Sequence, residues 1–222
     1  MDWQNFSTEL ELGITTHCQA ACPFCVRTHI ADSLHLMHLD LNDVKNFFDD
    51  LPNAIQTIRV CGNLGDPLMN PHLDDILDFL VFDKKLNFRL HTNGGIRNEV
   101  WFKDCARLGD HCNFVFGIDG TTQEINHIYR KNVDFGKAFN NMIACNRALP
   151  KGNVLWQFLV FPHNYHQVEE AKQIAEKNDI RIEYTINTRL HFDDDKNNEP
   201  WILNEAKQQL MLQDYHAWTE DY

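Results

Sequence analysis

The sequence has neither an apolar run that could span a bilayer nor an excess of basic residues. Its longest apolar stretch, residues 154–161, is interrupted by Gln157, whereas a membrane helix needs about 20 apolar residues. There are 20 Lys and Arg against 32 Asp and Glu, giving a formal net charge of -12. Nucleic acids and anionic membranes are bound by clustered basic residues, so we expect neither as a partner. The first residues lack a secretory signal pattern, which predicts a cytoplasmic protein.

The seven cysteines do not form a disulfide pattern, because their number is odd and most of them stand alone. In a reducing compartment they remain thiols. Three cysteines lie within eight residues and predict a metal site: Cys18, Cys22 and Cys25. The four scattered ones are expected to pack as small buried hydrophobes, and a role stays open only for Cys61: Cys61, Cys105, Cys112 and Cys145.

Short apolar runs alternate with amphipathic helical patterns six times along the chain. The expected strands are residues 9–15, 57–61, 86–91, 113–118, 154–161 and 180–186. This alternation predicts a parallel sheet with helices outside, and six units are fewer than the eight of a closed barrel. The expected fold is therefore α/β, a partial (β/α)6 TIM-like barrel formed by residues 1–190. Residues 191–222 are acidic at 193–195 and then helical from Pro200, and are expected to pack on or near the barrel as a tail.

Local signals predict several helix boundaries. Asn70 followed by Pro71 is typical of a helix start, and Thr121 with Glu124 has the spacing of a capping box. A helix over residues 97–108 is expected to stop at Gly109.

The three clustered cysteines follow directly on the first expected strand. In a parallel α/β barrel the loop after a strand lies at the catalytic end. Three thiolates can hold three irons of a [4Fe–4S] cluster and leave the fourth iron open to a ligand. A zinc site is the alternative and would need a fourth protein ligand, for which His17 or His29 is available.

The loop Cys18-Gln-Ala-Ala-Cys22-Pro-Phe-Cys25, with Phe24 before the third cysteine, resembles that of the radical SAM superfamily. The resemblance implies two cofactors, a [4Fe–4S] cluster on these cysteines and S-adenosyl-L-methionine, which binds the open iron. It also implies an oxygen-sensitive enzyme that cleaves S-adenosylmethionine reductively. The resulting 5′-deoxyadenosyl radical then abstracts hydrogen from a substrate.

Further motifs follow in the order of the family. The segment from Gly62 to Pro67, with Gly65 and Asp66, resembles the glycine-rich segment that meets the amino group of S-adenosylmethionine, although Asp66 replaces the usual glutamate. Thr92-Asn93-Gly94 resembles a motif facing the cofactor, which implicates Asn93.

Gly117-Ile118-Asp119-Gly120 resembles the family's Ser-Ile-Asp-Gly, so that Gly117 stands where a serine contact is expected and Asp119 borders the cofactor. Arg130 matches a frequent family arginine suited to the cofactor carboxylate. Of Gln157 and Asn164, one is expected to line the site and the other to cap the next helix.

The resemblance covers about Glu9 to Asn187 and implies an enzyme acting on a peptide or small molecule, with a flavodoxin or ferredoxin as electron donor. No cysteine follows Cys145, so an additional cluster in a C-terminal extension is not expected. Two alternatives are a zinc or iron–sulfur binding module, and a non-catalytic accessory protein on the same barrel.

Overall fold

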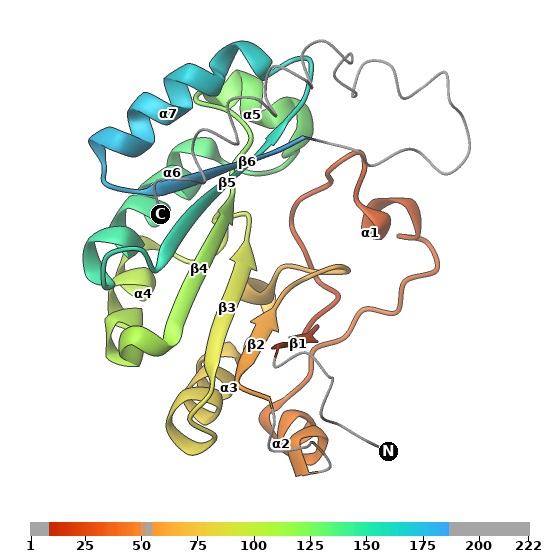
Figure 1. Ribbon diagram of the computed structural model, residues 1–222. Helices are drawn as coiled ribbons and strands as arrows, with labels where there is room; N and C mark the ends of the chain where they lie inside the picture. The colour runs from red at the N-terminus through yellow and green to blue at the C-terminus, as the bar shows by residue number, and fades with distance from the viewer. Residues whose placement is uncertain (1–8, 50, 52–54, 187–222) are drawn as a thin grey trace.

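The computed structural model describes residues 9–49, 51 and 55–186. Six parallel strands form one sheet in which the spatial order follows the chain order (Figure 1). Within the described chain the first and last strands do not pair, so the sheet is open. This confirms the predicted α/β partial barrel. The strands are β1 (Glu9–Leu12), β2 (Thr57–Val60), β3 (Asn87–Thr92), β4 (Cys112–Gly117), β5 (Val154–Val160) and β6 (Arg181–Ile186).

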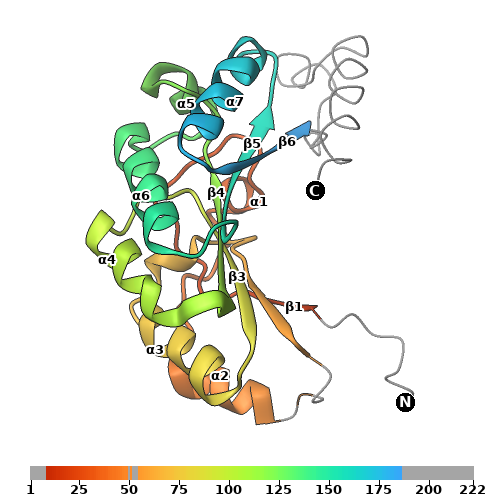
Figure 2. The same ribbon diagram turned by 60° about the vertical axis from the view of Figure 1, so that its left-hand side comes forward.

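The helices that connect the strands lie on one face of the sheet, as Figure 2 shows for α2, α3, α4, α6 and α7. We call this the helical face and the opposite one the inner face. The helices are α1 (Val26–His29), α2 (Leu41–Asp49), α3 (Leu73–Asp78), α4 (Glu99–Asp104), α5 (Gln123–Tyr129), α6 (Phe135–Ala148) and α7 (Val168–Lys177). Shorter helical segments are η2 (Pro67–Met69), η3 (Phe79–Asp83), η4 (Cys105–His111) and η5 (Tyr165–Gln167).

The main core lies between the sheet and these helices. Alternate residues of each strand point to the helical face, since successive strand side chains point to opposite sides. Phe88, Phe102 and Phe114 are fully buried there and meet edge to face. Burying such a side chain contributes about 2–3 kcal/mol. The same alternation directs every second residue to the inner face, where many of the side chains are polar.

Two helix starts differ from the sequence predictions, and in both cases a polar side chain has a tertiary partner. The third helix begins at Leu73 rather than after Asn70. The Oδ1 of Asn70 accepts from the N–H of His72 just before this helix, while its Nδ2 binds other segments. The N-cap of α5 is Thr122, whose hydroxyl accepts from a backbone N–H of the first turn. Thr121 instead donates to Glu170, at 2.8 Å, so the predicted capping box does not form.

The other boundaries agree more closely with the predictions. The first strand ends at Leu12 rather than at residue 15, because the backbone then turns toward the cysteine segment. Helical geometry ends as predicted at Gly109, where φ is 63°. The predicted tail, residues 191–222, lies outside the described residues. In the described part of the chain no helix combines the length and apolar character needed to cross a membrane.

Candidate active site

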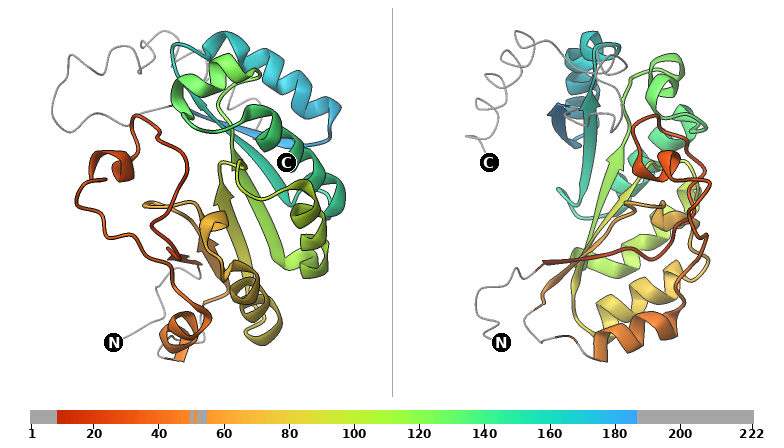
Figure 3. Two further views of the ribbon diagram at one scale, coloured as in Figure 1. Left: turned by 180° about the vertical axis from the view of Figure 1, so that it is seen from behind. Right: turned by 90° about the vertical axis from the view of Figure 1, so that its right-hand side faces the viewer.

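The three clustered cysteines lie on an excursion of the chain between β1 and α2, residues 16–37, which we call the cysteine loop. It extends toward the end of the sheet to which the strands point and then returns (Figures 1 and 3). Its base is closed by an antiparallel bridge between Thr15 and His38. Next to the bridge, the backbone N–H of Thr16 donates to the carbonyl of Met37 at 3.1 Å. The loop is therefore a closed unit.

Asn70 ties this base to the core. Its side chain is fully buried and donates from Nδ2 to the carbonyls of Ile14, at 2.8 Å, and Leu39, at 2.9 Å. Its Oδ1 accepts from the backbone N–H of His72. One amide thus fixes both chain segments that enter and leave the cysteine loop, and this role could not be read from the Asn-Pro pair.

The three thiols have an environment that suits iron–sulfur ligands. Cys22 is buried, Cys18 and Cys25 are half-buried, and none forms a disulfide. The N–H of Cys25 donates to the carbonyl of Cys22, at 3.1 Å, which holds the second and third cysteines in one turn. Phe24, which stands between them in the sequence, packs into the core with 5% of its surface exposed. Thiolates are the protein ligands of [4Fe–4S] clusters, so the donor set fits this group.

Burial keeps the thiols of Cys18 and Cys22 protonated in the absence of a metal. The pKa of Cys18 is raised to about 12, first by burial and then by the negative charge of Asp66. Burial also raises the pKa of Cys22, although the positive charge of Arg130 lowers it in part. Binding a metal therefore releases protons from these sulfurs.

Asn93 connects the cysteine loop to the sheet. Its amide forms a reciprocal pair with that of Gln19, with distances of 2.6 Å and 3.3 Å, and its Nδ2 lies 3.8 Å from the sulfur of Cys18. The same Nδ2 donates to Asp66 at 2.6 Å. Two of the predicted site residues, Asn93 and Asp66, are thus brought together with the first cysteine. Gln19 was not singled out from the sequence, since it lies between the first two cysteines, where the motif specifies no residue type.

Asp66 is buried with 3% exposure, and its carboxylate accepts hydrogen bonds from neighbouring groups of the protein. It accepts hydrogen bonds from the backbone N–H groups of Leu68 and Asn93 and from the hydroxyl of Thr92, besides the Asn93 side chain. A carboxylate has about four lone-pair sites, so these donors fill it. Burial raises the pKa of Asp66, while the backbone bonds from Asn93 and Leu68 oppose the increase.

Gly65 allows the segment before Asp66 to touch the start of the cysteine loop. A Cβ atom at Gly65 would lie 2.4 Å from the carbonyl oxygen of Thr15 and 2.8 Å from that of His17. The N–H of Asp66 donates to the same His17 carbonyl at 2.8 Å. Glycine is required here by the close approach of two backbones.

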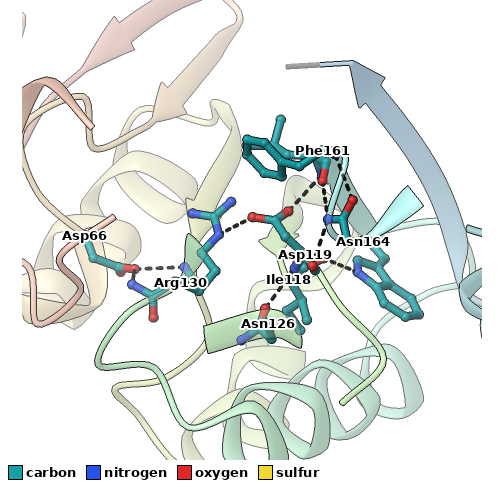
Figure 4. Close-up of polar contacts among 10 residues, drawn as sticks. Asp66, Ile118, Asp119, Asn126, Arg130, Phe161 and Asn164 are labelled. Carbon is teal, nitrogen blue, oxygen red and sulfur yellow. Dashed lines mark hydrogen bonds and ion pairs between the residues drawn. The ribbon is translucent and has the colours of Figure 1, made fainter. Parts of the chain in front are cut away.

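Arg130 points toward Asp119 (Figure 4), and its guanidinium also interacts with the thiol of Cys22. Its Nε donates to the fully buried carboxylate of Asp119 at 2.6 Å. Although burial lowers the pKa of Arg130, the charges of Asp119 and Cys22 raise it overall above the ordinary value. A Cβ atom at Gly117 would lie 2.6 Å from Nη2 of Arg130. The guanidinium therefore occupies the space where a serine side chain would begin.

Asp119 is held on all sides, which fixes the position of Arg130 (Figure 4). Its Oδ1 accepts from the N–H of Leu159, at 2.8 Å, and its own N–H donates to Asn126. Its carbonyl accepts from Asn164, whose Nδ2 also bonds Leu159. Asn164 therefore joins two strand ends and makes no side-chain cap, which corrects the expectation of a capping role. Asn126 was missed in the sequence, where nothing marks it.

The predicted site residues fall into two groups around the cysteine loop. Asp66, Asn93 and Gly65 lie at its first cysteine, and Asp119 with Arg130 lies toward its second. Gln157 is on the inner face next to Gly117 in the register, and no hydrogen bond joins its side chain to the described residues.

Of the remaining cysteines, three are fully buried as predicted, namely Cys105, Cys112 and Cys145, whereas Cys61 is only half-buried. Across the described residues, no three His, Cys, Asp or Glu side chains converge on one ion. A cluster places each thiolate on its own iron and does not need such convergence.

Solved structures with the same fold are radical SAM proteins. Streptococcus suis SuiB aligns with a TM-score of 0.73 and 14% identity over 96% of this chain and 46% of its own. The protein anSMEcpe, with bound AdoMet and a Cp18Cys peptide, aligns with a TM-score of 0.70 and 16% identity over 96% of this chain and 60% of its own. Methylornithine synthase (PylB) aligns with a TM-score of 0.60 and 12% identity over 80% of this chain and 52% of its own. The chain thus spans about half the length of these proteins, and at such identities the likeness shows the fold.

Comparison at the sequence level is more specific. No curated protein sequence matches the chain significantly. The sequence model of the radical SAM superfamily, in contrast, matches residues 12–175, well over half of the 222 residues. The matched part contains the cysteine loop and the residues that surround it. The chain belongs to the radical SAM superfamily.

Proposed function

We propose that this protein cleaves S-adenosylmethionine reductively at a [4Fe–4S] cluster bound by Cys18, Cys22 and Cys25. The 5′-deoxyadenosyl radical released by this cleavage abstracts hydrogen from a peptide or small-molecule substrate. The observation that carries the proposal is the position of the three thiols. They lie at the carboxyl end of a parallel sheet, framed by Asn93 and by Arg130. When bound, the cluster supplies the electron that breaks the S–C5′ bond.

The protein's own groups prepare the sulfurs for this role. The Asn93 amide points at Cys18 and the guanidinium of Arg130 lies against Cys22. Both are hydrogen-bond donors, and donors to a sulfur stabilise its thiolate form and tune the potential of a bound cluster. The negative charge of Asp66 acts in the opposite direction on Cys18.

Arg130 is our candidate for the carboxylate of S-adenosylmethionine. Its Nε is occupied by Asp119, which leaves the outer N–H groups of a fixed guanidinium to meet an anion. Asp66, whose lone pairs are filled, is proposed to act by orienting Asn93 and the backbone at Gly65. Gln157, on the inner face beside Gly117, is proposed to line the same site.

The substrate class and the electron donor complete the proposal. The anSMEcpe structure contains a peptide, and the inner face of this sheet carries many polar side chains, so a peptide or a polar small molecule is proposed. A flavodoxin or ferredoxin is proposed as the donor. The non-catalytic alternative was suggested by Gly117 and Asp66, which both depart from the family pattern. Arg130 occupies the space beside Gly117.

The test is anaerobic reconstitution with iron and sulfide, followed by dithionite and S-adenosylmethionine and an assay for 5′-deoxyadenosine. We expect the product from the wild type and from Cys145→Ala, a buried cysteine far from the loop in sequence. Cys18→Ala, Cys22→Ala and Cys25→Ala should lose both the visible iron–sulfur absorbance and the product. A cluster that survives the triple alanine variant would disprove the ligand assignment, and an intact cluster without product would favour the non-catalytic protein.

A further inference from the structure

A basic group of residues lies on the inner face of the sheet, away from the residues assigned above. Arg59 of β2 and Arg89 of β3 are direct neighbours in the parallel register. Neighbouring strands are about 4.8 Å apart, and like charges at such positions repel one another. His91, two residues beyond Arg89 on the same face of β3, lies within electrostatic reach of both arginines. The two adjacent arginines contrast with the net charge of -12 of the chain, and His91, whose pKa is lowered, is neutral beside them.

The two arginines differ in their partners. Arg59 is neutralised by ion pairs with Glu9, at 2.5 Å, and Glu11, at 3.9 Å. Arg89 is exposed and forms no ion pair or hydrogen bond with any residue in the described part of the chain. Its register partner on the other side is Asn113, which is uncharged. Arg89 therefore keeps a full positive charge and five N–H donors for an external anion.

His91 adds an unsatisfied polar atom at the same place. Its Nε2 is buried and finds no hydrogen-bond partner among the described residues. A buried polar group without a partner costs about 1–3 kcal/mol, so a ligand that accepts a bond from Nε2 recovers that energy. Arg89 and His91 could bond the same anionic group, because their side chains follow one another along one face of one strand.

The distance of Arg89 and His91 from the cysteine loop limits the size of the molecule that they could bind. Asn93, whose Nδ2 lies 3.8 Å from the sulfur of Cys18, directly follows the last residue of β3 and stands two residues beyond His91. With a rise of about 3.3 Å per residue, His91 lies about 7 Å and Arg89 about 13 Å from Asn93 along the strand. A molecule of the size of a dipeptide to a tetrapeptide, about 7–14 Å when extended, spans that distance.

We propose that Arg89 and His91 form a substrate subsite for an anionic oxygen group, a carboxylate or a phosphate. It holds that group about 7–13 Å from the cysteine loop along β3. The inference rests on the proposed function, and it names the substrate class as anionic. Arg59 belongs to the subsite only as a neighbour whose charge Glu9 and Glu11 already balance.

The test is calorimetric titration of the anaerobic protein with three probes: acetyl-Gly-Glu-Gly-amide, its glutamine counterpart and inorganic phosphate. We expect the wild type to bind the glutamate peptide or phosphate at least about tenfold more tightly than the glutamine peptide. Preference for the glutamate peptide identifies a carboxylate, and preference for phosphate identifies a phosphate ester. Equal, weak binding of all three probes would refute the subsite.

Substitutions at Arg89 provide a second test in the same binding assay. Arg89→Gln should abolish the discrimination and Arg89→Lys should keep part of it. Arg107→Gln, which removes an exposed arginine paired with Asp78 away from β3, should leave it unchanged. Retained discrimination in Arg89→Gln would overturn the proposal. Because Arg89 is exposed, circular dichroism of the variant should match that of the wild type.

The two proposals fail separately, because probe binding is measured without turnover. Discrimination between the peptides without any 5′-deoxyadenosine production would contradict the radical chemistry and leave the anion subsite in place. Production of 5′-deoxyadenosine without discrimination between the peptides would support the radical chemistry and refute the anion subsite.

Discussion

At the scale of single residues, the exchange of a serine for Gly117 is explained by its neighbour rather than by loss of function. The guanidinium of Arg130 occupies the space above Gly117 and is fixed there by Asp119. A single sequence shows a missing hydroxyl at this position but not the group that replaces it, because Gly117 and Arg130 meet only after the chain has folded.

Gly117→Ser should therefore displace Arg130. We expect a loss of about 1–3 kcal/mol in the free energy of unfolding, as is typical of overpacking. We also expect about tenfold weaker binding of S-adenosylmethionine, measured by equilibrium dialysis of the reconstituted protein. Gly136→Ser is the matched control, since its Cβ would meet nothing closer than 3.4 Å. Unchanged cofactor binding in Gly117→Ser would show that Arg130 has no part in it.

His91 predicts a pH dependence of stability. Burial, followed by the charges of Arg59 and Arg89, lowers its pKa to about 4. Between pH 6.5 and 4 the unfolded chain therefore binds more protons than the native protein, and stability falls as the pH falls through this window. Each unit of the shift corresponds to about 1.4 kcal/mol, and partial exposure reduces the total to about 1–2 kcal/mol.

Urea unfolding of His91→Asn at several pH values tests this. The variant should lose less stability than the wild type between pH 6.5 and 4, while His127→Asn on the outer helix α5 should follow the wild type. His163, whose pKa is also lowered to about 4 by burial, should contribute a separate part of the same dependence. Parallel curves for His91→Asn and wild type would contradict the assignment.

At the scale of elements, periodicity predicted most strands to within a residue or so, because the buried runs are long and bounded by turn residues. The errors occurred where a polar side chain bonds a distant segment. Asn70 and Thr121 have the residue types and spacing of helix caps, yet each bonds another part of the fold. The cysteine motif and its companions could be found in the sequence. The network through Gln19, Asn126 and Asn164 could not, because no local pattern requires amides there.

Asn70→Ala tests the link between two elements, β1 and the start of α2. It removes the amide that donates hydrogen bonds to the carbonyls of Ile14 and Leu39. We expect a loss of about 2–4 kcal/mol in the free energy of unfolding. The cysteine loop should also exchange its amide hydrogens faster. Asn146→Ala, which removes half-buried bonds to Asn178 and Asp179, should cost less than about 1 kcal/mol. Similar losses in the two variants would contradict the role given to Asn70.

At the scale of the whole molecule, the sheet and the cysteine loop should respond differently to the cluster. The sheet is held by backbone hydrogen bonds between its strands and by the core under the helices. The cysteine loop, in contrast, is fixed by a few side chains such as Asn70 and Asn93. A ligand that binds only the native state stabilises the part that it contacts. Reconstitution should therefore slow hydrogen exchange of residues 16–37 by at least about tenfold and leave β2 to β5 unchanged. Uniform protection of the sheet would show that the cluster acts on the global fold.

The frame of the cysteine loop also has a consequence for the order of biosynthesis. All three thiols are translated by residue 25, but the groups that hold the loop, Asp66 and Asn93, come much later in the chain. Arg130, which faces Cys22, follows later still. A nascent chain that has just exposed its cysteines thus carries the ligands without the support that arranges them. Iron delivered at that stage encounters cysteines on an unfolded chain. Iron delivered after Arg130 has been translated encounters cysteines that the folded protein can hold in place.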